Sequence, residues 1–320
     1  MVEVVVAGAI NWDINLFVRR FPRPGEETPV IRITRVPGGK AGNVSVAAAR
    51  LLGLGRVGII GALGQDDIAE TQLRLLNIEG VDTSAITRKT NVESGQAYII
   101  TEESGENVIH TYFGANAMLK PTDILSKGGG EMIQSARMTT ITDPPEETVD
   151  PITRIAHETG RLIAWDPGIR AEAGMERLRS ILLRTRYLFL NEVEAEYMTG
   201  VTQPADAARR LWEINPDMTT ILKSGKEGCT VFKARAAIRV PGIDLPKFGL
   251  KVVNTVGCGD AFLGAFSAAK AMDLSDEESV HWANWAGALK ATKPETRGSP
   301  TRDELQKWIA RTGTHQSDRQ

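Results

Sequence analysis

Short apolar runs alternate along the chain with segments whose apolar residues recur at helical spacing. The chain opens with a valine-rich apolar run at residues 4–10, which favours a buried strand over a helix. Further runs of this kind predict strands at residues 57–60, 161–165, 187–190, 219–223 and 230–232. Helical spacing predicts helices at residues 44–52, 68–77, 148–158, 192–198, 205–214, 261–272 and 277–291. Strands separated by crossover helices imply an α/β fold, with a mostly parallel sheet covered by helices on both faces.

Two regions rich in β-branched and aromatic residues depart from this alternation. Residues 12–36 are interrupted by three prolines, which suits short, exposed strands better than core strands. Residues 95–114 alternate on either side of a polar turn at residues 102–107, a pattern typical of a hairpin. We expect the two regions to pair into a small β-sheet that stands off the main body as a lid over a site.

Composition and charge narrow the choice of partner. With 38 Lys+Arg against 40 Asp+Glu, the 320 residues carry a formal net charge of −2, so no bulk field attracts nucleic acid or an anionic membrane. No run approaches the roughly 20 apolar residues of a membrane span, and the apolar start lacks the basic flank of a signal peptide. Two cysteines and four scattered histidines indicate neither a disulfide framework nor a structural metal. Length favours one large or two ordinary domains, and we expect a cytoplasmic protein that binds a small polar molecule.

The glycine-rich segments differ in what precedes and follows them. Residues 53–58 match the G-x-G-x-x-G pattern, but they leave a predicted helix and enter a predicted strand, the reverse of the dinucleotide fingerprint. We interpret these glycines as a helix end and a tight turn. The Walker-type pattern G-x-x-x-x-G-K-[ST] is absent from the sequence. Three consecutive glycines at residues 128–130 are typical of a flexible loop.

A second glycine-rich segment directly precedes an alanine-rich predicted helix. Gly38 and Gly39 let the backbone approach a ligand closely, while Lys40 and Asn43 offer donors for hydroxyl or phosphate oxygens. The alternative is an ordinary loop in which Asn43 caps the helix.

The third segment, residues 254–264, carries the most specific chemistry. Gly257, Cys258 and Gly259 place main-chain N–H groups at a predicted helix start, where these groups and the helix dipole attract an anion. Asp260 in the first turn is then a candidate general base for an alcohol that attacks a bound phosphoryl group. A carboxylate here also simply favours the helix dipole, which is the structural alternative. A nucleophilic Cys258 is disfavoured because the sequence identifies no histidine neighbour.

Together these segments resemble the ribokinase family, the PfkB-type carbohydrate kinases, over essentially the whole chain. Residues 38–43 are similar to the first family signature, and residues 254–260 are similar to the second, usually Asp-Thr-x-Gly-Ala-Gly-Asp. The resemblance implies a single domain over residues 1–320, with a ribokinase-like three-layer α/β/α fold, a mostly parallel central sheet and a small β-sheet lid. Residues similar to intervening landmarks of the family are 114–116, 166–170, 191–194 and 223–228.

The resemblance also implies roles for individual residues. Asp260 corresponds to the general base, and the anion hole is formed by the main chain of Gly257, Cys258 and Gly259. The implied acceptor-side residues are Asn11, Asp13, Gly38, Gly39, Lys40, Asn43, Asp143 and Arg170. The implied nucleotide-side residues are Asn191, Glu194, Lys223, Gly225, Gly228 and Asn284, with Glu194 linked indirectly to Mg²⁺. Without the resemblance, several of these are equally typical of turns, helix starts or surface positions.

Two positions depart from the family pattern. Asn254 stands where the family has an aspartate linked to a monovalent cation, so the loss of charge argues against activation by potassium. Cys258 replaces an alanine, a small change beside a site built from main-chain N–H groups. Asn254 together with Lys40 also leaves a phosphorylated sugar as an alternative acceptor substrate.

From these observations we expect an ATP- and Mg²⁺-dependent kinase that phosphorylates a hydroxyl, and by preference a hydroxymethyl, of a free pentose or hexose. Closure of the lid over the site would exclude water. A nucleoside kinase, a sugar-phosphate kinase and an ADP-using donor site are alternatives within the same family. An NAD-dependent oxidoreductase lacks its fingerprint here, and a non-catalytic sugar-binding protein has no use for Asp260. A homodimer formed through the exposed lid is a further expectation.

Overall fold

The computed structural model of the protein describes residues 1–126 and 128–317. Within this part of the chain the main sheet has ten strands, and it is parallel except where β13 pairs antiparallel with β12 and with β14. In sheet order the strands are β14 (Ala236–Pro241), β13 (Gly228–Lys233), β12 (Thr219–Lys223), β11 (Tyr187–Asn191), β10 (Leu162–Trp165), β9 (Met138–Ile141), β1 (Val4–Ala7), β4 (Val57–Leu63) and β5 (Val81–Asp82), while β6 (Ile86–Arg88) pairs with β4.

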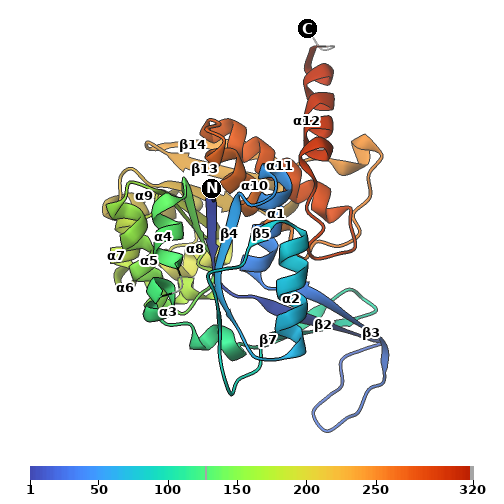
Figure 1. Cartoon of the computed structure of the whole chain (residues 1–320). Helices are drawn as coiled ribbons and strands as arrows, with labels where there is room; N and C mark the ends of the chain where they lie inside the picture. The colour runs from blue at the N-terminus through green and yellow to red at the C-terminus, as the bar shows by residue number, and fades with distance from the viewer. Residues whose placement is uncertain (127, 318–320) are drawn as a thin grey trace.

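Helices cover both faces of this sheet, and alternate strand residues enter two separate hydrophobic cores (Figure 1). Val4 and Val6 of β1 belong to the first core and Val5 and Ala7 to the second, which explains why the strand is apolar at every position. The first core includes α1 (Lys40–Leu52), α2 (Asp67–Ile78), α10 (Cys258–Ala271), α11 (Asp276–Ala291) and α12 (Arg302–Ser317). The second includes α3 (Pro121–Ser126), α4 (Gly129–Ser135), α5 (Glu146–Glu158), α6 (Gly174–Arg177), α7 (Arg179–Arg184), α8 (Glu192–Thr199) and α9 (Pro204–Ile214). This arrangement confirms the predicted three-layer α/β/α fold.

The two regions set apart in the sequence form a second, four-stranded sheet, which confirms the predicted lid sheet. Its strand order is β3 (Val30–Gly38), β2 (Asn11–Val18), β7 (Gly95–Glu102) and β8 (Asn107–Tyr112). The hairpin between β7 and β8 is antiparallel as expected, whereas β2 and β7 run parallel. This small sheet projects from one end of the main body (Figure 1).

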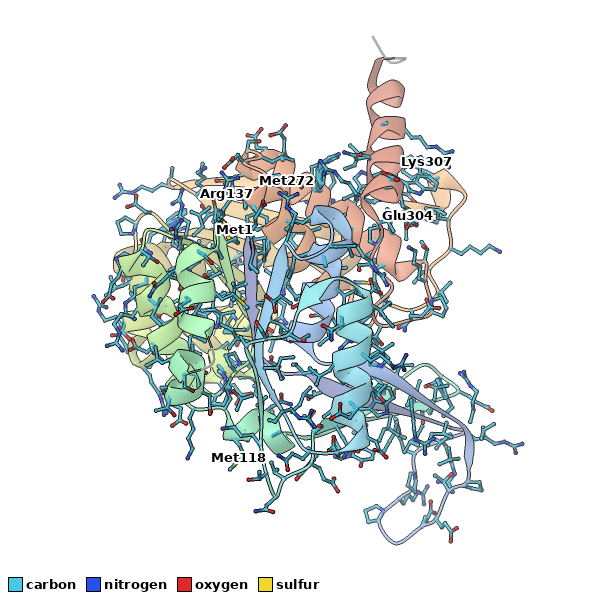
Figure 2. All side chains as sticks on the ribbon, viewed as in Figure 1. Met1, Met118, Arg137, Met272, Glu304 and Lys307 are labelled. Atoms are coloured by element: carbon cyan, nitrogen blue, oxygen red, sulfur yellow. The ribbon has the colours of Figure 1, made fainter. Side chains whose placement is uncertain are left out.

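The lid lies at the end of the main sheet where its parallel strands finish. Figure 2 places Met1, Arg137 and Met272 together at one end of the molecule and Met118 near the other. Arg137 precedes β9 and donates a hydrogen bond to the carbonyl of Ala271, so this first end is where β1 and β9 begin. The opposite, carboxyl end of β1 leads into β2 at Asn11, which carries the chain directly into the lid.

Several local expectations were wrong or incomplete. Of the three glycines expected to form a loop, Gly129 and Gly130 begin α4, and only Gly128 is left-handed, with φ 74°. Sequence patterning missed β9 and β14. Residues 53–58 do connect α1 to β4, as the interpretation of that segment required. In the described residues we find no helix with the length and apolar character needed to cross a membrane.

Candidate active site

The carboxyl ends of the parallel strands bring most of the candidate residues to one place. In sheets of this kind ligands bind in the crevice outside those strand ends. Asp143 follows β9, Asp166 follows β10, Asn191 ends β11 and Lys223 ends β12. Asn11, the first residue of β2, follows β1 on the same side. Residues far apart in the sequence are therefore neighbours because the strand order makes them so.

Asp260 lies in the first turn of α10, three residues after Gly257, the residue that precedes the helix. Its carboxyl accepts a hydrogen bond of 2.8 Å from the side-chain amide of Asn43. Burial raises the pKa of Asp260, while the ammonium of Lys40 and the bond from Asn43 act in the opposite direction. A raised pKa brings a carboxylate closer to the basicity that proton abstraction from an alcohol requires. The geometry is therefore that expected of the predicted base.

The loop that leads into α10 requires glycine at its last position, Gly257. Gly257 has φ 85°, and a Cβ there would lie 2.5 Å from the carbonyl oxygen of Thr296. A Cβ on Gly259 would instead meet no atom within 4 Å, so the start of the helix faces open space. Burial raises the pKa of Cys258, which opposes its alternative role as a thiolate nucleophile. The main-chain N–H of Cys258 donates to the carbonyl of Thr255 at 3.2 Å, so the N–H groups of Gly257 and Gly259 are the better candidates for binding an anion here.

Three charged side chains form a linked group beside Asp260. The buried carboxylate of Asp166 accepts from the ammonium of Lys40 at 3.1 Å and from that of Lys223 at 2.5 Å. Burial alone would raise the pKa of Asp166, but the two ammonium groups hold it below the usual aspartate range. Burial would likewise lower the pKa of Lys40, but the carboxylates around it, led by Asp166, raise that pKa overall. One buried carboxylate thus holds the ammonium groups of both lysines in place.

Residues 38–43, which we call the acceptor loop, are closely packed against the start of the lid. A Cβ on Gly38 would lie 2.1 Å from the carboxyl of Asp13, and one on Gly39 would lie 2.4 Å from the backbone nitrogen of Asn11. Burial raises the pKa of Asp13 to about 7, although the guanidinium of Arg297 lowers it. The two glycines are therefore required for Asn11 and Asp13 to reach this position.

Arg297 is a buried cation that sequence analysis missed. Its guanidinium donates to the side-chain oxygen of Asn43 at 3.1 Å and to the carbonyl of Gly38 at 2.8 Å. A Cβ on Gly42 would lie 2.3 Å from this guanidinium. Burial lowers the pKa of Arg297 to about 10, and the carboxylate of Asp13 acts in the opposite direction. Arg297 therefore ties the acceptor loop to the segment that follows α11.

Two further residues received no individual role from the sequence, although they lie in segments that it singled out. Asn116 accepts from the backbone nitrogen of Ile10 at 2.9 Å and donates to the side-chain oxygen of Asn11 at 2.8 Å, so it orients Asn11. Asp166 is the centre of the two-lysine group. Asp143 is placed by different bonds: its carboxyl accepts from the backbone of Ala9 at 3.1 Å, and Arg170 lies at its carbonyl.

A cavity of about 680 Å³ borders the first turn of α10. This volume is within the range of small-molecule sites. Four of the predicted nucleotide-side residues line it, namely Lys223, Gly225, Gly228 and Asn284. Cys258 and Gly259 line it as well, so the cavity adjoins the start of the helix.

The other two nucleotide-side predictions have a structural role. Asn191 and Glu194 form the capping box of α8: Asn191 accepts from the backbone of Glu194 at 2.8 Å, and Glu194 accepts from the backbone of Asn191 at 2.9 Å. Neither residue lines the cavity. Glu194 nevertheless contributes to the raised pKa of Lys40, which places its charge beside the crevice. Its predicted link to a metal stays a prediction.

Comparison with known proteins assigns the family. The pfkB family of carbohydrate kinases matches residues 1–302. The chain belongs to this family. Membership confirms the prediction of a kinase, a phosphotransferase with an alcohol acceptor. The chain is 30% identical to an ATP-dependent ribose-1-phosphate kinase of Halopiger xanaduensis, over 97% of this chain and 99% of the relative. It is also 30% identical to the ribokinase of Bacillus subtilis, over 97% of this chain and 100% of the relative.

Solved structures agree on the fold of this pfkB-family kinase. The ribokinase of Thermotoga maritima superposes with a TM-score of 0.84 at 24% identity, over 97% of this chain and 100% of the other. The ribokinase of Arabidopsis thaliana in complex with ribose and ATP gives the same TM-score and identity, over 97% and 99% of the two chains. The predicted ribokinase-like fold is thereby confirmed.

Proposed function

We propose that this kinase transfers the γ-phosphoryl group of ATP to a hydroxymethyl group of a pentose or hexose, with Asp260 as the general base. One observation carries the proposal: the partly buried carboxyl of Asp260 is joined at 2.8 Å to Asn43 of the acceptor loop, and the turn beside it borders the 680 Å³ cavity. The acceptor therefore belongs on the Asn43 side and ATP belongs in the cavity.

The reaction follows from these positions. Asp260 takes the proton of the acceptor hydroxyl, and the hydroxyl oxygen attacks the γ-phosphorus as the bond to the leaving ADP breaks. The main-chain N–H groups of Gly257 and Gly259 stabilise the charge on the transferring group, as does the dipole of α10. Lys40 and Lys223, both held by Asp166, add positive charge at the floor of the crevice.

Mg²⁺ is part of the proposal, and the residues present fit it. No group of three His, Cys, Asp or Glu side chains that could hold a metal occurs among the described residues. Mg²⁺ in kinases is commonly held by one or two carboxylates together with substrate phosphates, a mode that needs no such group. Glu194, whose charge acts on Lys40, is the carboxylate we assign to it. When bound, the ion would neutralise phosphate charge.

A phosphorylated pentose is the second candidate acceptor. The relative from Halopiger xanaduensis is named for the phosphorylation of ribose 1-phosphate. In this chain Lys40 and Arg170 both lie by the acceptor side of the crevice, Lys40 at Asp166 and Arg170 at the carbonyl of Asp143. Two cations there suit an acceptor phosphate as well as hydroxyl groups.

The lid and the cellular setting complete the proposal. The lid carries exposed apolar side chains on its outer strands, among them Ile31, Ile33 and Ile109. Exposed strand edges with such residues favour pairing with a second copy, so we propose a homodimer through the lid. A cytoplasmic location, where ATP is available, is consistent with the proposed reaction.

An acceptor panel tests the proposal. ADP release is measured with ATP, and separately AMP release with ADP as donor, over free sugars, sugar phosphates and nucleosides. We expect release with ATP and Mg²⁺ to depend on a pentose or hexose and to stop when Asp260→Asn replaces the wild type. Preference for a sugar phosphate would select the second candidate, and acceptor-independent release alone would contradict the proposal.

A further inference from the structure

Lys290 is a fully buried lysine that none of the roles above uses. It lies near the end of α11 and has 0% of its surface exposed. Its ammonium donates a hydrogen bond of 2.8 Å to the backbone carbonyl of Asn254. A charged group inside a protein is costly unless its neighbours compensate for the lost water. The segment that the buried ammonium contacts begins at Asn254.

That segment is the loop of residues 254–257, which leads into α10. The loop is fastened to the end of α11 at several points. The backbone nitrogens of Val253 and Asn254 both donate to the carbonyl of Ala291, at 2.7 and 3.1 Å. The side-chain amide of Asn254 donates to the carbonyl of Pro294 at 2.8 Å, and its oxygen accepts from the backbone of Val256 at 3.0 Å. The ammonium of Lys290 thus anchors the first residue of the loop.

The charge of Lys290 also acts on the turn that would hold the phosphoryl group. Burial lowers the pKa of Lys290, and the groups that act in the opposite direction are Cys258, Glu295 and Asp260. Two of these three belong to the first turn of α10. The ammonium is therefore near enough to that turn to add positive potential behind its main-chain N–H groups, where negative charge develops during transfer.

The side chain of Asn254 fits this arrangement. Both of its polar atoms are used within the protein, one on Pro294 and one on Val256. The backbone carbonyl oxygen of Asn254 accepts the hydrogen bond from Lys290. An amide can donate to the Pro294 carbonyl, whereas a carboxylate at this position would have no proton to give. Asn254 and Lys290 thus form one internally satisfied unit.

We propose that Lys290 is a positioning residue that acts as a built-in monovalent cation. Its ammonium holds residues 254–257 so that the N–H groups of Gly257 and Gly259 are directed at the transferring phosphoryl group, and phosphoryl transfer needs no added potassium. This inference rests on the proposed kinase reaction. It extends that reaction by naming the group that organises the anion hole and by predicting how the enzyme responds to salt.

The first test uses the wild-type protein alone. Steady-state kinetics are measured at equal ionic strength in potassium, sodium or tetramethylammonium chloride, and ATP affinity is measured by calorimetry without acceptor in the same salts. We expect kcat and the dissociation constant of ATP to stay within twofold across the three salts. A tenfold dependence of either quantity on potassium would overturn the inference.

The second test removes the ammonium. In Lys290→Met we expect kcat to fall at least tenfold while KM for the acceptor stays within twofold. In Lys290→Ala, which leaves room for a small cation, we expect ammonium or potassium ions to restore kcat at least threefold, and to restore ATP affinity. A merely structural role would predict neither the kcat-specific loss nor the rescue by cations.

A matched control separates this role from loss of a buried lysine in general. Lys270 also has a largely buried side chain, and its ammonium donates to the carbonyl of Leu274 at 2.7 Å and to Asp276. We expect Lys270→Met to lower the unfolding temperature but to leave kcat within twofold. A folded Lys290→Met with wild-type kcat would overturn the inference. Should neither Lys290 variant fold, the wild-type salt series still decides it.

The outcomes also distinguish the inference from the proposed function. Absence of turnover with every acceptor of the panel contradicts the proposed reaction. In that case the role of Lys290 is tested by ATP affinity alone: a dissociation constant within twofold across the three salts supports it, and a tenfold dependence on potassium overturns it. Turnover by the wild type that depends strongly on potassium leaves the kinase function intact and contradicts only the role of Lys290.

Discussion

The side-chain amide of Asn43 donates a 2.8 Å hydrogen bond to the carboxyl of Asp260, across 217 positions of the sequence. The other end of the same amide accepts from Arg297. One small side chain thus joins the acceptor loop, the candidate base and a buried cation. The contact thus links the position of the candidate base on α10 to that of the acceptor loop.

Replacement of Asn43 is expected to affect the rate more than nucleotide binding. Asn43→Ala removes a donor to Asp260 and leaves the carboxyl without the bond that lowers its pKa and orients it. We expect kcat/KM for the acceptor to fall by roughly 10²-fold, the lower range for a misplaced general base, while ATP affinity stays within about threefold. Unchanged kcat/KM would show that the Asn43 contact does not position the base.

Asp13 is expected to impose a pH dependence on acceptor binding. Its pKa is raised to about 7, mainly by burial. In the ionised form both carboxylate oxygens accept hydrogen bonds from sugar hydroxyls, whereas the protonated form uses one oxygen as a donor. We therefore expect kcat/KM for the acceptor to rise with pH through about 7 and to level off above it. In Asp13→Asn this rise should disappear along with most of the activity, and its persistence would assign the pH dependence to another group.

The same carboxyl should lower stability as the pH rises. The unfolded chain releases the proton of Asp13 near the ordinary aspartate pKa of 3.8, whereas the folded protein holds it to a pKa of about 7. Between these values the unfolded state binds fewer protons, so the free energy of unfolding falls with increasing pH. We expect Asp13→Asn to gain about 2 kcal/mol more stability at pH 8 than at pH 5 in denaturant titrations. An equal effect at both pH values would contradict the raised pKa.

Arg297 is expected to control acceptor affinity. Arg297→Lys keeps a cation but cannot hold both Asn43 and the Gly38 carbonyl through one planar group. We expect KM for the acceptor to rise by roughly tenfold, equivalent to about 1.4 kcal/mol, with ATP affinity unchanged. Arg302→Lys, at an exposed position on α12, is the matched control and should behave as wild type. An acceptor KM that stays within twofold in Arg297→Lys would remove this role.

The fold was largely predictable because its central strands are apolar on both faces. In β1 every residue from Val4 to Ala7 is fully buried, and this leaves a clear signal in the sequence. β9 was missed although it is equally buried, because Thr139 and Thr140 interrupt its apolar pattern. Thr140 is tolerated in the core since its hydroxyl pairs with that of Ser267, 127 positions away. No local pattern reveals such a partner.

The candidate site was predictable only where a residue belongs to a local signature. Asp260 and Gly257 share one short segment, and the helix start explains both. Arg297 stands in a polar stretch that is typical of an exposed loop, yet its buried guanidinium donates to the carbonyl of Gly38 and to Asn43, both more than 250 positions away. Lys290 likewise falls within a regular helix, and only the path of the Asn254 loop shows what its ammonium binds. Sequence reasoning does not supply these long-range contacts.

The central claim is that Asp260 removes the proton of the acceptor hydroxyl. The most direct measurement compares wild type and Asp260→Asn with the best acceptor of the panel, following single-turnover formation of the phosphorylated product together with ATP binding by calorimetry. The asparagine keeps the size of the side chain but cannot take a proton. We predict that product formation slows by about 10³-fold or more while the dissociation constant of ATP changes less than about threefold. Product formation by Asp260→Asn at a rate near that of the wild type would contradict the account.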